Sequence, residues 1–199
     1  TGKIANTCSI LIIMAKKCLF LLLLLPLLLT IGFVVQIRKI DTDLTHTTVV
    51  PLNNNGSLLS IDKHASKRRI YFFVSEAGKI IKYERKYRGF VTDWWVKSQA
   101  TKFANNKMLS FYHEHNPQSG QAESFPFFGL YKEKKDFTYY ADIYYFLKEK
   151  YFFMLLAAFI GFILGGAWSI DTIGGATHNK GIFACFLLEL VYLAILLFF

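Results

Sequence analysis

Long apolar runs and one polar block divide this chain of 199 residues. The apolar runs cover residues 18–37, 151–170 and 181–199. At about 1.5 Å of helix per residue, each run is long enough to cross the hydrocarbon of a bilayer. The polar block shows the alternation typical of strands. The pattern therefore predicts an integral membrane α-helical protein of about three transmembrane helices, with a small β-rich (α+β) soluble domain inserted between helix 1 and helix 2.

The predicted boundaries follow the changes in composition. In order they are an N-terminal segment 1–17, helix 1 at 18–37, the soluble domain at 38–136, an interfacial aromatic and basic segment at 137–150, helix 2 at 151–170, a short loop at 171–180 and helix 3 at 181–199. A signal peptide is the alternative for the first run, but the run is longer than a usual signal core, which favours a retained anchor. Pro26 predicts a kink there unless a neighbouring helix relieves it.

Within the soluble domain, strand signals surround two turns. Ile70–Val74 and Lys79–Tyr87 predict a hairpin, because Gly78 is available for the turn between them. In the second of these strands Ile81, Tyr83 and Arg85 share one face. The run Asn53-Asn54-Asn55-Gly56 predicts another turn, with short strands near 48–52 and 57–61.

A helix is predicted next, at Thr92–Ala104, followed by a strand at Lys107–His113. Trp94 and Trp95 are adjacent, so both cannot face the same core, and one of them is expected to meet lipid headgroups or a partner. Tyrosines and lysines then gather before helix 2, which indicates an interfacial belt. A cofactor-stacking role for these tyrosines is the weaker interpretation. The tyrosines of the belt are Tyr139, Tyr140, Tyr144 and Tyr145.

The last two apolar runs carry features that suit helix packing. Gly161, Gly165 and Gly166 form a small face that allows another helix to approach closely. Glu189 lies near the middle of the third run, where a lone carboxylate costs a few kcal/mol to bury in lipid. It is therefore expected to face protein or to be protonated. Packing against another helix and a role in transport are both open.

The candidate chemistry is sparse. His113 and His115 point the same way on a strand and can share a metal ion, but two ligands do not complete a site. The alternative is a polar strand end leading into Asn116-Pro117. No HExxH, GxSxG, Walker or GxGxxG motif occurs, which disfavours an enzyme. The three cysteines lie in or beside apolar segments with no CxxC spacing, and no cofactor is expected.

The net charge of +9 arises because 23 lysines and arginines outnumber 14 acidic residues. Nineteen of the 23 lysines and arginines lie between Arg38 and Lys150, together with 12 acids, so nucleic acid is not the expected partner. Anionic lipid headgroups explain the excess equally well. Lysines near the N-terminus, Lys3, Lys16 and Lys17, favour a cytoplasmic N-terminus. The cations beside the helices argue the reverse, and they are Arg38, Lys39, Lys148 and Lys150. We expect a bacterial cytoplasmic (inner) membrane, with the soluble domain on its extracytoplasmic side.

The hairpin, the Ala-containing helix KSQATKFA and the segment MLSFYHEHNPQSGQAE occur in this order between membrane helices. The arrangement resembles the membrane proteins grouped as "domain of unknown function 3592". It covers about Val49–Glu123 and the flanking helices, and relatives often carry Asp then Pro where this chain has His113 and Glu114. The resemblance implies an anchored β-domain with no established activity. The matching positions are Gly78, Ala100, Phe111, Tyr112, Asn116 and Pro117.

These patterns favour a non-enzymatic membrane protein over an enzyme. Its β-rich domain and helices are expected to mediate protein–protein interaction, as an accessory or structural subunit of a membrane assembly. The expected partners are the lipid bilayer and either another protein or a second copy of the chain. A transport or channel-forming protein that uses Glu189 is the first alternative. A metal-binding sensor or hydrolase that uses His113 and His115 is the other.

Overall fold

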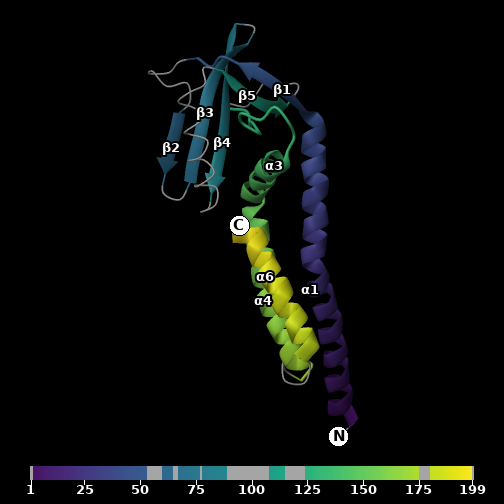
Figure 1. Cartoon of the computed structure of the whole chain (residues 1–199). Helices are drawn as coiled ribbons and strands as arrows, with labels where there is room; N and C mark the ends of the chain where they lie inside the picture. Colours follow the sequence, from purple (N-terminus) through teal and green to yellow (C-terminus); the bar gives the residue numbers. More distant parts are fainter. Residues whose placement is uncertain are drawn as a thin grey trace. The chain divides into compact units, whose positions relative to one another are not determined.

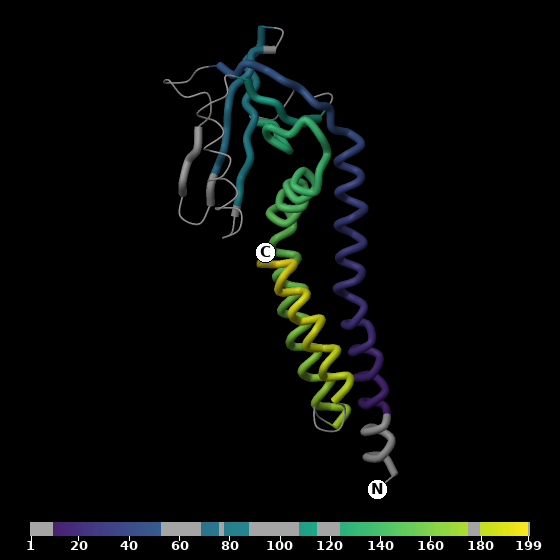
Figure 2. The backbone as a smooth tube through the Cα atoms, viewed as in Figure 1, coloured from purple at the N-terminus to yellow at the C-terminus, as the bar shows by residue number. Residues whose placement is uncertain are grey.

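The structure is a computed structural model, and it describes residues 2–52, 60–64, 67–76, 78–88, 108–114, 124–174 and 180–198. The chain divides into two compact units. A helical unit consists of Thr1–Val34 and Tyr151–Phe199, and a polar unit consists of Val35–Lys150. Figures 1 and 2 trace the chain from the N-terminus, in purple, to the C-terminus, in yellow.

Three helices are long and apolar enough to cross a membrane: α1 (Gly2–Asp43), α4 (Phe152–Thr172) and α6 (Lys180–Phe198). They correspond to the three apolar runs of the sequence. Helix α1 continues beyond the predicted end at Ile37 and runs directly into the first strand at Leu44. The charges that begin at Arg38 end the apolar run but not the helix, since lysine and arginine are good helix formers.

Pro26 lies inside α1 without ending it. The hydroxyl of Thr30 donates to the carbonyl oxygen of Pro26 at 2.8 Å. The same hydroxyl lies 2.7 Å from the hydroxyl of Tyr192 on α6. A polar link between two helices of the unit therefore lies one turn beyond the proline.

The described residues of the polar unit form two antiparallel sheets, whose strands lie between α1 and α4 in the sequence (Figure 1). One contains β2 (Ser60–His64), β3 (Lys67–Glu76) and β4 (Lys79–Arg88), in that order. The other pairs β1 (Leu44–Val49) with β5 (Leu109–Glu114). The small β-rich region predicted between the first two apolar helices is confirmed.

The predicted hairpin is present as β3 and β4. Glu76 pairs with Lys79 across the turn, and Gly78 has φ +79°, which favours glycine. Strand β1 begins at Leu44, four residues before the predicted start at Thr48, and ends at Val49. Pro51 lies just beyond it and has no backbone N–H to donate to a sheet. The predicted helix 92–104 lies outside the described residues.

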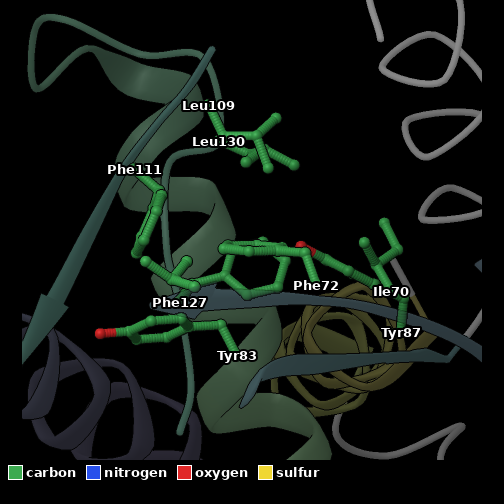
Figure 3. Close-up of a cluster of buried hydrophobic side chains, with 9 residues drawn as sticks. Ile70, Phe72, Tyr83, Tyr87, Leu109, Phe111, Phe127 and Leu130 are labelled. Atoms are coloured by element: carbon green, nitrogen blue, oxygen red, sulfur yellow. The ribbon is translucent and has the colours of Figure 1, made fainter. Parts of the chain in front are cut away.

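The core of the polar unit forms where the inward faces of the strands meet the segment 124–131 (Figure 3). Phe125 adds a short parallel pairing to β4, in which its N–H donates to the Lys82 carbonyl oxygen and its own carbonyl accepts from the Glu84 N–H. The buried side chains alternate along the strands, as the period-2 pattern requires. They are Ile70, Phe72, Val74, Tyr83, Tyr87, Leu109, Phe111, Phe127 and Leu130.

The segment predicted as interfacial, 137–150, forms the helix α3 (Phe137–Lys150). Asp136 caps its N-terminus, since a carboxylate oxygen accepts from the Tyr139 N–H at 2.9 Å. The buried positions are Tyr139, Asp142, Ile143, Leu147 and Lys148, which form a stripe at helical spacing. Helix α3 thereby belongs to the polar unit and packs beside β4.

Candidate functional site

The most heavily buried charged groups of the described chain lie between β4 and α3. Arg85 follows Tyr83 on the inward face of β4, and its side chain is only 1% exposed. Its Nη2 donates to the Asp142 carboxylate at 2.7 Å and to the Asp142 backbone carbonyl at 2.8 Å. Asp142, also 1% exposed, lies in the buried stripe of α3. The pair links the sheet to the helix.

Asp142 gathers two further donors. The hydroxyl of Tyr87 lies 3.3 Å from the carboxylate oxygen that pairs with Arg85. The backbone N–H of Gly129 donates to the other carboxylate oxygen at 2.9 Å. Gly129 has φ +57°, and a side chain there would meet the ring of Tyr139. One carboxylate thus joins β4, α3 and the segment 124–131.

Aromatic rings surround the Arg85 guanidinium. Its central carbon lies 4.7 Å from the ring centre of Phe128, 4.9 Å from that of Phe146 and 5.2 Å from that of Tyr87. Cations over ring faces are stabilised, more so when water is excluded. Nε and Nη1 of Arg85 are buried and have no hydrogen-bond partner among the described residues. Contacts with these three aromatic rings therefore take the place of hydrogen bonds on this side of the guanidinium.

The charges of this network are fixed at ordinary pH. Burial is the largest influence and lowers the pKa of Arg85, but the Asp142 carboxylate and the Tyr87 side chain together raise it by more, so the net pKa lies above the usual value. Burial, followed by the Asp142 charge, raises the pKa of Tyr87 well above its usual range. Since three donors hold the carboxylate and neither Arg85 nor Tyr87 titrates near neutrality, the network suits a structural link better than proton transfer.

His113 of the predicted metal pair is buried and packed among aromatic rings. Its Nδ1 lies 2.8 Å from the Glu114 carbonyl oxygen, and its ring centre lies 5.6 Å from that of Tyr83. His115 lies outside the described residues. Within the described ranges, no group of three histidine, cysteine or acidic side chains is placed to hold a metal ion.

Two of the three glycines singled out on α4 approach helices of the same chain. A Cβ on Gly165 would come within 2.9 Å of Leu22 on α1, and one on Gly166 would overlap the ring of Phe186 on α6. That ring stacks on Phe162, with 4.9 Å between centres. Gly161 is exposed, and nothing lies within 4 Å of the position its Cβ would take.

Glu189 is partly buried on α6, and no hydrogen bond or ion pair joins it to the described residues. The apolar surroundings of a membrane-type helix make such a carboxylate costly. Position 189 thus keeps the two interpretations that the sequence raised, a packing contact and a transport role.

The interface candidates divide into three kinds. Tyr139 is completely buried and donates its hydroxyl to the Asp41 carboxylate at 2.7 Å, so its side chain is covered by the polar unit itself. Its position in the buried stripe of α3 is the reason. Tyr140, Tyr144 and Tyr145 keep part of their surface exposed. Trp94 and Trp95 lie outside the described residues.

Comparison of the chain with protein-family models, curated proteins and solved structures finds no match. The resemblance to the "domain of unknown function 3592" proteins therefore stays a prediction. Conclusions about function rest on the residues and their geometry alone.

Sequence reasoning missed the Arg85–Asp142 link. Arg85 had been placed on one strand face with Ile81 and Tyr83, but its burial was not inferred. A signal for Asp142 was present, because it is the acid in a helical stripe with Tyr139 and Ile143. An acid in an apolar stripe requires a buried donor, and only the tertiary fold shows that this donor is Arg85.

Proposed function

We propose that this chain is a non-enzymatic integral membrane protein that associates with other protein through its helices and its β-rich unit, as an accessory or structural subunit. The three apolar helices support membrane insertion by their length and composition. The buried ionic network supports a structural role for the polar unit, since its charged groups, Arg85 and Asp142, pair with each other.

The exposed face of α4 around Gly161 is the observation that carries this proposal. Gly165 and Gly166 are covered by α1 and α6, whereas the space beside Gly161 is open. Ala157 is also exposed, four residues before Gly161, so the two small residues lie on one face of the helix. Small residues four apart let two helix backbones approach closely in a bilayer. The proposed occupant of this face is a helix of a second copy or of another membrane protein.

Purification from native membranes in mild detergent tests the association. We expect the wild-type chain to migrate as an oligomer or with a co-purifying protein, and Gly161→Leu to weaken this association. Gly32→Leu is the matched control, because Gly32 is also exposed on an apolar helix with nothing within 4 Å of its Cβ position. Its neighbours four residues away are Leu28 and Gln36, so it has no small-residue face. A wild-type chain that runs alone would contradict the proposal.

The proposed location is a cytoplasmic membrane with the polar unit on the extracytoplasmic side. Lysines near the N-terminus support this orientation. A cysteine introduced at the exposed Ser75 of β3 reports on it. We expect a membrane-impermeant thiol reagent to label Ser75→Cys in intact cells, whereas labelling only after permeabilisation would reverse the orientation.

A further inference from the structure

Two cations of the polar unit are buried, and they differ in their partners. Arg85 is paired with Asp142, as described above. Lys148 on α3 is 7% exposed, yet no carboxylate lies within ion-pair distance of it in the described part of the chain. Its Nζ lies 5.0 Å from the ring centre of Tyr145. Nζ of Lys148 is not among the buried unpartnered polar atoms of the described chain, so the stem is buried while the ammonium reaches the surface of the unit and can meet an anion from outside.

The position of Lys148 suggests what supplies the anion. It lies four positions before Phe152, where the apolar helix α4 begins. The exposed Arg38 and Lys39 follow the apolar run of α1. The described residues between α1 and α4 contain no other candidate span, so all three cations would lie on one side of a bilayer. Lipid phosphates form the layer directly outside the hydrocarbon, where lysine ends and tyrosine rings gather.

We propose that Lys148 binds the phosphate group of an anionic phospholipid at the end of α3. This inference rests on the proposed membrane insertion of α4. The ring of Tyr145 lies beside the amine, and the phosphate supplies the ion-pair partner that no described residue provides. Arg38 and Lys39 add to the attraction without burial, since cations close to an anionic surface each contribute to lipid binding. A soluble phosphate compound offers the same chemistry, but the apolar helix four residues away favours the lipid.

The charge state of Lys148 is compatible with this site. Burial lowers the pKa of Lys148, and the neighbouring Glu149 opposes this shift. A bound phosphate would raise the pKa again, because an opposite charge favours the ammonium form. Lysine rather than arginine is suited to the site as a compact point charge on a flexible stem.

Reconstitution of the full chain tests the site. Wild-type protein is purified in detergent with equal amounts of phosphatidylglycerol and phosphatidylcholine, and the retained lipid is measured by native mass spectrometry. We expect phosphatidylglycerol to be retained about fivefold over phosphatidylcholine, the factor given by one lysine at a lipid surface. Lys148→Met is expected to abolish most of this preference, and Lys148→Arg to keep it in part. Lys86→Met, on the exposed edge of β4, is the control that leaves it unchanged.

Three outcomes would overturn the proposal. Equal retention of both lipids, or an unchanged preference in Lys148→Met, would show that Lys148 holds no lipid phosphate. If inorganic phosphate alone stabilised the protein against heat as much as phosphatidylglycerol does, Lys148 would belong to a site for free phosphate. Loss of a co-purifying protein instead of lipid in Lys148→Met would assign the residue to a protein contact. Extraction of native membranes with alkaline carbonate separates failure of the lipid site from failure of the proposed membrane insertion. A chain released by carbonate refutes membrane insertion itself.

Discussion

The guanidinium of Arg85 and the carboxylate of Asp142 meet at 2.7 Å although 57 positions separate them in the chain. Each side chain is 1% exposed. Two charges removed from water in this way are stabilised only while they remain together, because the loss of hydration is large for either one alone. The pair thus makes the docking of α3 on β4 specific, since any other arrangement leaves a buried charge without its partner.

Removal of Asp142 alone is the first prediction. Asp142→Leu leaves Arg85 buried without an anion and is expected to destabilise the polar unit by about 3–5 kcal/mol. The free energy of unfolding, measured by chemical denaturation of the full chain in mild detergent, checks this value. The variant also removes the acceptor of the Gly129 N–H, which adds to the loss.

Two controls separate charge from packing at this site. The double variant Arg85→Met with Asp142→Leu removes both charges and is expected to be more stable than Asp142→Leu alone. Lys86→Ala is the surface control, since its amine lies 3.9 Å from Glu84 with half the side chain exposed, and its effect should stay below about 1 kcal/mol. A double variant as unstable as the single one would show that packing, not charge, dominates the link.

Two buried tyrosines predict a loss of stability at alkaline pH. Burial, together with the Asp41 carboxylate, raises the pKa of Tyr139, and burial with Asp142 raises that of Tyr87. An unfolded tyrosine titrates near pH of about 10. Because the pKa of each tyrosine is higher in the folded state, its contribution to the free energy of unfolding is complete below a pH of about 10. That contribution is lost as the pH rises from there through the folded pKa. Phenolate absorbance and unfolding free energy, followed together, should show these tyrosines ionising only as the unit unfolds.

Tyr139→Phe tests one of these groups. The variant loses the hydrogen bond to Asp41, so about 1 kcal/mol of stability at neutral pH and part of the alkaline decline should disappear. Tyr140→Phe is the matched control, since Tyr140 is the next residue and is 38% exposed. Equal effects of the two substitutions would contradict the assignment of the buried hydrogen bond.

The glycines of α4 predict opposite effects of the same substitution. Gly166→Ala places a methyl group into the ring of Phe186 and is expected to cost about 1–3 kcal/mol. Gly161→Ala meets nothing within 4 Å and should be neutral or stabilising by up to about 1 kcal/mol, because alanine favours the helix. Melting temperatures in detergent compare the two variants. A Gly166→Ala chain as stable as wild type would refute the close approach of α4 and α6.

The β3–β4 hairpin could be predicted because its signals are local. Alternating apolar residues fix the strand faces, and Gly78 supplies the turn conformation with φ +79°. The three apolar helices follow from length and hydropathy alone. These features do not depend on which other segment covers them.

The burial of particular polar residues could not be predicted in this way. Tyr139 and Tyr144 both lie on α3, but only Tyr139 belongs to the buried stripe that packs against the rest of the polar unit. The end of α1 was missed because the sequence changes from apolar to charged at Arg38 while helix propensity continues. Tertiary contacts decide the burial of Tyr139, whereas helix propensity decides where α1 ends.

Asp136, which caps α3, predicts a loss of stability in acid. Its side chain accepts from the amine of Lys132 and the hydroxyl of Thr138, and these hydrogen bonds, with that from the Tyr139 N–H, lower the pKa of the carboxyl well below its usual range. A depressed pKa gives a contribution that is complete above the unfolded value of about 3.9 and is lost as the pH falls below it. Asp136→Ala should lose about 1 kcal/mol at neutral pH.

Asp136→Asn distinguishes the charge from the cap. Asparagine caps a helix about as well as aspartate, so the variant should lose little stability at neutral pH. It carries no titrating carboxyl, so the decline between about pH 4 and pH 2 should become shallower than in wild type. Unfolding free energies measured across that range compare wild type, Asp136→Ala and Asp136→Asn. An identical acid decline in all three proteins would assign the acid sensitivity to other carboxylates, whereas a shallower decline in both variants places it at the first turn of α3.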